Sequence, residues 1–99
     1  AGVRVERTDE YAEWIDKLKD QAGRARILMR VERLIGGNPG QRRNLAEGVS
    51  EFKIDFGPGY RVYCSEGGTR LLLLLAGRDK STQQTDIRLA ISLARDFKE

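Results

Sequence analysis

The chain contains no histidine and a single cysteine, and this scarcity argues against several common kinds of site. Zinc sites and redox-active disulfides are built from clusters of these two residue types at short spacings. The glycines form neither a Walker nor a Rossmann pattern, which are the usual signals of a nucleotide site. We therefore expect no metal ion and no cofactor. The lone Cys64 is predicted to be a small buried hydrophobic side chain in a reducing, cytoplasmic setting.

Long hydrophobic runs are also missing. The longest run, residues 71–76, has the length of a β-strand and is far too short to span a membrane. The N-terminal residues lack the hydrophobic core of a signal peptide, so we expect no membrane association. The 99 residues predict one domain, 1–99, with a single core. A net charge of +3, with 18 basic residues, slightly favours a polyanion or an acidic protein as partner.

The segment Glu51 to Tyr63 is predicted to be a β-hairpin, because two short alternating runs flank Gly57-Pro58-Gly59. A three-residue turn sets Lys53 opposite Tyr63 and Asp55 opposite Arg61. A two-residue turn would mix charged and apolar residues on both faces, so the longer turn is favoured. One face is then apolar and carries Phe52, Ile54, Phe56, Tyr60, Val62 and Cys64. The other face is polar and carries Lys53, Asp55, Arg61 and Tyr63.

The segments before the hairpin predict a strand and a pair of helices. Residues 2–7 alternate as a strand does, and Thr8 is a suitable cap for a helix that ends near Asp20. A second helix is predicted from Gln21 to Ile35, with Gly36-Gly37 as its stop. Its apolar stripe is predicted to consist of Ala25, Leu28, Val31, Leu34 and Ile35. Residues 21–43 hold six arginines and one acidic residue, so this part of the chain is basic.

After the hairpin, the sequence predicts a third antiparallel strand and a last helix. Residues 70–76 are so continuously apolar that the strand should be central, with residues 2–7 beside it. A two-residue turn at Gly67-Gly68 sets Leu73 opposite Val62 and Ala76 opposite Gly59. Leu72 and Leu74 then flank the polar face of the hairpin. The last helix begins after Ser81 or Thr82, and its apolar stripe is Ile87, Ala90, Ile91, Ala94 and Phe97.

Together these elements predict an α+β fold. It contains a small, mostly antiparallel four-stranded sheet, a helical hairpin on one face and a C-terminal helix, in the order β-α-α-β-β-β-α.

Basic and phenolic side chains are the remaining candidates for a functional site. Lys53, Arg61 and Lys80 are expected to converge near the hairpin tip and to act as catalytic residues on a phosphodiester. Cleavage of RNA by its 2′-hydroxyl needs a proton acceptor, a proton donor and stabilisation of the phosphorane charge. Arg61 can stabilise the negative charge of the phosphorane, and a lysine can act as the base where neighbouring cations favour its neutral form. The residues predicted to bind the substrate are Tyr63, Arg78, Arg42 and Arg43.

A plainer interpretation of the same residues is that Asp55 and Arg61 form an ordinary cross-strand ion pair. Lys53 is then a solvated strand residue, and Tyr63 is half-buried cover.

Two stretches carry a resemblance to a known family. GPGYRVY at residues 57–63 is followed by a glycine-containing turn, an aliphatic strand and GRDKSTQQTDIRLA at residues 77–90. With the helical hairpin and NPGQRRNLAEGVSEFKIDFGPGYR at residues 38–61, this order resembles the HigB-like branch of the RelE/ParE toxin superfamily, the addiction-module killer proteins. The resemblance covers nearly the whole chain. It implies a small sheet with helices on one side and an exposed face for RNA.

The resemblance also implies a function. RelE-type relatives are ribosome-dependent mRNA endonucleases that inhibit translation with clustered lysine and arginine residues. For this chain that implies a toxin of a type II toxin–antitoxin system and a metal-independent endoribonuclease. Its partners would be the ribosome, mRNA and a cognate antitoxin, a small helix-turn-helix protein. By position, Lys53 and Arg61 match the basic residues of the hairpin strands, and Lys80 replaces part of the remaining function.

Two alternatives remain open from the sequence. One is a ParE-like inhibitor of DNA gyrase, which shares the fold and needs no catalytic cluster. The other is a degenerate, non-catalytic member that only binds an antitoxin. Asp55 stands where RelE-like enzymes often carry a second basic residue, and their late tyrosine has no counterpart in the last helix. Asp55 is therefore expected either to orient Arg61 or to neutralise it.

Overall fold

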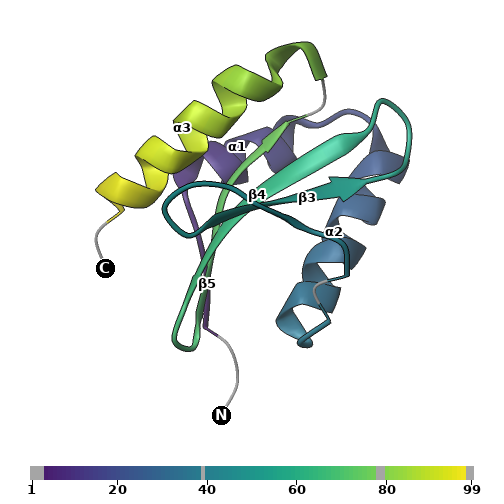
Figure 1. Ribbon diagram of the computed structural model, residues 1–99. Coiled ribbons are helices and arrows are strands. Elements are labelled where there is room, and N and C mark those ends of the chain that lie inside the picture. The colour runs from purple at the N-terminus through teal and green to yellow at the C-terminus, as the bar shows by residue number, and fades with distance from the viewer. Residues whose placement is uncertain (1–3, 39, 78–79, 98–99) are drawn as a thin grey trace.

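The computed structural model describes residues 4–38, 40–77 and 80–97 of the chain. In this part a strand and two helices precede four strands and a final helix (Figure 1). The elements are β1 Arg4–Arg7, α1 Asp9–Lys17, α2 Gln21–Ile35, β2 Arg43–Asn44, β3 Val49–Ile54, β4 Tyr60–Gly67, β5 Arg70–Gly77, a short 3-10 helix η1 Lys80–Thr82, and α3 Gln83–Asp96.

The predicted α+β class and element order are confirmed, with one added strand. The sheet has five strands in the order β1-β5-β4-β3-β2. The addition is the two-residue strand β2, which pairs with β3 and was not predicted from the sequence. As predicted, β1 lies beside the apolar strand β5, and this pair is parallel while the other three pairs are antiparallel.

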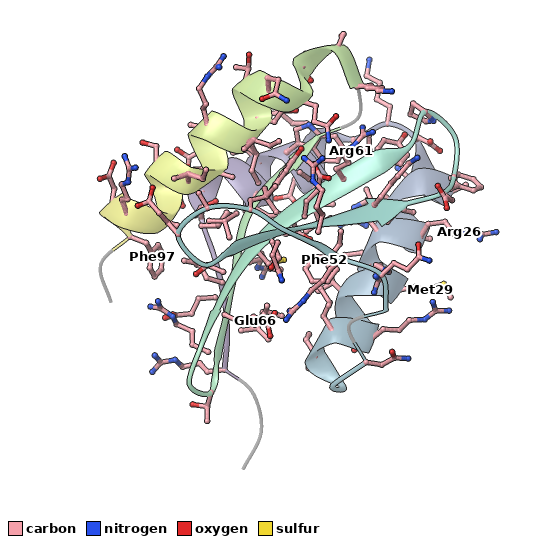
Figure 2. The ribbon with its side chains drawn as sticks, viewed as in Figure 1. Arg26, Met29, Phe52, Arg61, Glu66 and Phe97 are labelled. Carbon is pink, nitrogen blue, oxygen red and sulfur yellow. The ribbon has the colours of Figure 1, made fainter. Side chains whose placement is uncertain are left out.

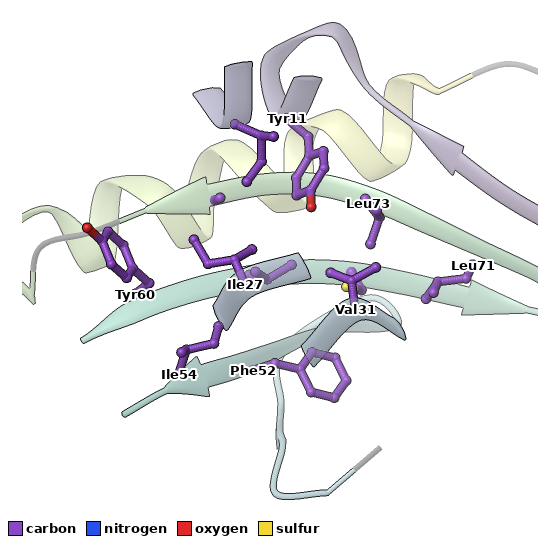
Figure 3. Close-up of a cluster of buried hydrophobic side chains, with 12 residues drawn as sticks. Tyr11, Ile27, Val31, Phe52, Ile54, Tyr60, Leu71 and Leu73 are labelled. Carbon is purple, nitrogen blue, oxygen red and sulfur yellow. The ribbon is translucent and has the colours of Figure 1, made fainter. Parts of the chain in front are cut away.

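Helices cover both faces of the sheet (Figure 1). On one face, α1 and α2 pack on a core that includes Ile15, Ile27 and Phe52. Figure 3 shows this cluster, with Val31 of α2 beside Phe52 of β3. On the other face, α3 packs on a second core made by Val49, Tyr63, Leu72, Leu74, Leu75 and Ala90. The apolar character of β5 follows from this arrangement, because both of its faces are buried.

The helix boundaries largely follow the sequence signals. Thr8 caps α1, and its hydroxyl accepts a hydrogen bond from the backbone N–H of Tyr11 at 3.0 Å. The predicted bounds of the second helix are those of α2, and Gly36 is its C-cap. The predicted stripe of the last helix is also confirmed, since Ile87, Ala90, Ile91, Ala94 and Phe97 all belong to the second core.

The predicted apolar stripe of α2 is partly wrong. Ile27 is fully buried, whereas Leu28 is 37% exposed and Ala25 is also exposed. Gly23 explains which side of α2 is buried. Because Gly23 has no side chain, the helix can approach Tyr60 closely, and the side that carries Gly23 and Ile27 faces the sheet. The predicted members that do face the core are Val31, Leu34 and Ile35.

The predicted register of the β3–β4 hairpin is wrong by two residues. Lys53 pairs with Arg61, and Glu51 pairs with Tyr63. The loop comprises the five residues between Ile54 and Tyr60, with Gly57 and Gly59 at positive φ angles of 58° and 86°. A shift of two residues leaves every side chain on its original face, so the alternation that predicted the faces could not distinguish the two registers. The predicted apolar face is confirmed.

The register of β4 with β5 also differs from the prediction. The turn is one residue later than expected, so Gly67 pairs with Arg70 and Leu73 pairs with Cys64. A register shift between Tyr63 and Cys64 then sets Val62 opposite Ala76. Such a shift marks a β-bulge, in which one strand has an extra residue and the alternation of side chains between the two faces changes locally. Through it, Leu74 and Leu75 both contribute to the core under α3.

Candidate functional site

The polar face of the hairpin is not the open surface that the sequence suggested, because α3 covers much of it. Tyr63 is fully buried among the residues under α3, so its ring is not exposed for stacking against a base. Burial, and then the negative charge of Glu51, raises the pKa of Tyr63. The accessible chemistry therefore lies toward the hairpin tip.

Three side chains line one depression at that tip. Lys53 from β3, Arg61 from β4 and Lys80 from η1 surround a hollow of about 370 Å³, which the hairpin loop completes. Lys53 and Lys80 are exposed, whereas Arg61 is only 7% exposed and forms part of the wall. The cross-strand pairing of Lys53 with Arg61 explains two of these positions, and η1, which precedes α3, supplies the third. These are the three residues that the sequence suggested as catalytic.

Asp55 does not lie opposite Arg61. It is in the loop, its side chain is 86% exposed, and its carboxylate lies 3.6 Å from the ammonium of Lys53. An exposed pair of this kind contributes little to stability and is easily exchanged for solvent. The expected cross-strand pairing of Asp55 with Arg61 is therefore wrong, because it depended on the incorrect register. Asp55 instead borders the same depression as Arg61 from the hairpin loop.

Glu51 is the acid beside Arg61. Its Oε2 lies 4.0 Å from Nε of Arg61, and the side-chain amide of Gln83 donates a hydrogen bond to the same oxygen at 2.8 Å. Its Oε1 lies 3.5 Å from Nε of Arg43. Glu51 is itself buried, with 6% of its surface exposed. The four side chains come from three strands and a helix, so they form a polar cluster at the edge of the second core.

Glu51 and Gln83 were not among the site residues predicted from the sequence. Glu51 shares the face of Lys53 because the two are separated by two strand positions, and this alternation was the available signal. Gln83 is the first residue of α3. The contact between them depends on where α3 crosses the sheet, which the pattern of either element alone does not specify.

The predicted substrate-binding arginines lie next to this cluster. Arg42 and Arg43 line a second hollow of about 550 Å³, and Glu51 and Lys53 also border it. Lys53 therefore borders both hollows. Arg42 forms an ion pair with Glu66, and Arg43 faces Glu51. Arg78 lies outside the described residues. The surface between the hairpin tip and β2 thus combines several cations with one buried carboxylate.

Other kinds of site have little support in the described residues. They contain no group of three or more histidine, cysteine, aspartate or glutamate side chains that could hold a metal ion. Burial raises the pKa of the Cys64 thiol to about 12, which keeps it protonated and makes it a poor nucleophile near neutral pH. None of the helices described is long and apolar enough to cross a membrane.

Comparison with known proteins gives one clear relative in sequence. No family model matches the chain. An uncharacterized protein of Haemophilus influenzae is 39% identical over 95 residues, and the match covers 96% of each chain. The chain belongs to the family of that protein. The relative has no described activity, so the family does not by itself specify a reaction.

Comparison of structures identifies the fold. The E. coli toxin RelE, solved in the free state as a mutant with two arginines replaced by alanine, superposes with a TM-score of 0.75. The match covers 98% of this chain and 100% of the RelE chain, at 10% sequence identity. At that identity the similarity establishes the fold alone. The chain has the RelE fold over nearly its whole length.

Proposed function

We propose that this protein is the toxin of a type II toxin–antitoxin system, of the HigB-like branch, and that it cleaves mRNA on the ribosome. The observation that carries the proposal is the depression lined by Lys53, Arg61 and Lys80 on a RelE fold. A cluster of cations in a shallow hollow suits a phosphodiester, whose negative charge increases in the transition state.

The three residues can divide the work of a metal-independent cleavage. The 2′-hydroxyl of the RNA loses its proton and attacks the adjacent phosphorus, and the 5′-oxygen leaves with a proton. Arg61 has the fixed planar fork that stabilises charge on the phosphorane oxygens. Lys53 and Lys80, which both line the hollow, are the proposed proton acceptor and donor. Arg42 and Arg43 are proposed to hold the neighbouring phosphates.

The proposal includes partners and a location. The substrate is mRNA in the ribosomal A site, and the protein acts in the cytoplasm. A cognate antitoxin, proposed to be a small helix-turn-helix protein, neutralises it by binding its basic surface.

Primer extension on transcripts during induced expression tests the proposal. The intact protein should produce ribosome-dependent cuts within codons, and Lys53→Ala, Arg61→Ala and Lys80→Ala should each reduce cutting by about a hundredfold. Arg88→Ala is the matched control, because Arg88 is an exposed cation of α3 outside both hollows. Growth arrest with uncut transcripts contradicts the proposal. Inhibition of gyrase supercoiling by the purified protein would then favour a ParE-like function.

A further inference from the structure

The most unusual charged group near the proposed site is the buried carboxylate of Glu51. A charge is costly to bury unless partners compensate it. Glu51 has partners on three elements: Gln83 of α3 at 2.8 Å, Arg43 of β2 at 3.5 Å and Arg61 of β4 at 4.0 Å. The carboxylate is therefore fixed from several sides rather than free to follow a single cation.

Arg61 is held at two points by its surroundings. Its Nη1 donates a hydrogen bond to the carbonyl oxygen of Gly59 at 3.2 Å, and its Nε faces Glu51. The guanidinium is planar and rigid, so contacts at Nε and at one terminal nitrogen determine the orientation of the whole group. The Arg61 side chain is 9% exposed and still borders the depression shared with Lys53 and Lys80.

We infer that Glu51 is a positioning residue that orients the guanidinium of Arg61 toward the depression. Gln83 takes part by fixing the carboxylate oxygen that faces Arg61. The catalytic consequence rests on the proposed function. Orientation of a charged group before the reaction affects the transition state more than substrate binding, and a misplacement of about 1 Å can cost about a hundredfold in rate. The contact between Glu51 and Arg61 can also be tested by a measurement that does not depend on RNA cleavage.

The first test measures mRNA cleavage on purified ribosomes with the intact protein and with Glu51→Gln. The substitution retains the shape of the side chain and removes its charge. We expect kcat to fall about tenfold to a hundredfold with little change in KM. The double variant Glu51→Gln/Arg61→Ala should be no slower than Arg61→Ala alone, because Glu51 acts through Arg61. Glu13→Gln on the opposite face of the sheet is the control and should leave kcat unchanged.

Two kinetic results would overturn the inference. One is an unchanged kcat in Glu51→Gln. The other is a further loss in the double variant, since this would give Glu51 a role independent of Arg61. Where Glu51→Gln does not reach the native circular dichroism spectrum, Gln83→Ala replaces it. Gln83→Ala releases the carboxylate while retaining its charge, and it should reduce kcat in the same direction by a smaller factor.

The second test follows the Arg61 Nε–H group by nitrogen-15 NMR in the free protein. We expect slow exchange with solvent in the intact protein and clearly faster exchange in Glu51→Gln. Exchange as fast as that of an exposed arginine in the intact protein overturns the positioning role, whatever the cleavage assay shows. The two conclusions can also be separated. If the Arg61 Nε–H exchanges slowly in the intact protein and fast in Glu51→Gln, but the protein cuts no transcript, the positioning role is retained and the proposed endonuclease function is rejected.

Discussion

Gly23 is the residue at which α2 comes closest to the sheet. A Cβ atom at this position would lie 2.5 Å from Cε2 of Tyr60 and 2.6 Å from Oδ2 of Asp20. These two groups are themselves joined, because the Tyr60 hydroxyl donates a hydrogen bond to Asp20 at 2.6 Å. We expect Gly23→Ala to lower the free energy of unfolding by about 1–2 kcal/mol, because overpacking exceeds the gain in helix propensity.

Urea denaturation measures this effect, and Gly36→Ala is its matched control. A Cβ at Gly36 would lie 3.5 Å from the nearest atom, the carbonyl oxygen of Glu32. That variant should therefore retain nearly the full stability of the intact protein. Equal stability of the two variants would contradict the packing role assigned to Gly23.

Cys64 provides a second prediction for a single side chain, on pH. Burial raises its pKa from 9.0 to about 12, so folding favours the protonated thiol. This contribution to stability is complete below pH 9 and is lost as the pH rises toward 12. A thiol reagent at pH 8 should react with the native protein far more slowly than with the urea-unfolded protein. Equal rates would show that the thiol is accessible in the native state.

At the scale of elements, Thr8 joins the end of β1 to the start of α1. Its hydroxyl donates a hydrogen bond to the carbonyl of Leu74 at 2.6 Å and accepts one from the N–H of Tyr11 at 3.0 Å. Thr8→Ala should cost about 2 kcal/mol of stability, because the helix loses its cap and a buried carbonyl loses a donor. Thermal unfolding measures this loss. Thr8→Ser retains the hydroxyl, so it should keep most of the stability that Thr8→Ala loses.

The elements were more predictable than the contacts between them. Helix caps and the alternation of strand faces are local signals, so Thr8 and the apolar face of the hairpin could be identified from sequence. The register of the hairpin could not be identified from sequence. It depends on the length of the loop, and a shift of two residues leaves every side chain on the same face. Lys53, Arg61 and Lys80 could be grouped through their nearness to the hairpin tip, and their roles stay a prediction. Glu51 required the correct register to be recognised.

For the whole molecule, the main feature is an uneven distribution of charge. Residues 21–43 carry six arginines against one acidic residue, and α2 also exposes Leu28 and Met29, which are 37% and 56% exposed. Figure 2 shows Arg26 and Met29 on α2, and both border a hollow between this helix and the hairpin loop. This mixture of apolar and basic side chains suits contact with the proposed antitoxin, if the antitoxin presents apolar and acidic side chains to it.

We expect Arg26→Glu/Arg33→Glu to slow association with the purified cognate antitoxin about tenfold, and to make the rate less sensitive to salt. Cleavage by the free protein should be unchanged, because neither arginine lines the two hollows of the site. Lys17→Glu, on the more acidic first helix, is the control. Equal association rates for the double variant and the intact protein would exclude this face of α2 from the contact.

The parallel pairing of β1 with β5 also determines the order in which the protein can fold. The hydrogen bond between Thr8 and Leu74 spans 66 residues, so the first strand has no partner until the fifth has been synthesised. Contacts of such long range slow folding. Gln83, which fixes Glu51, lies later still in the chain. Because chains are synthesised from the N-terminus, the nascent protein cannot assemble this cluster until α3 has emerged from the ribosome that makes it.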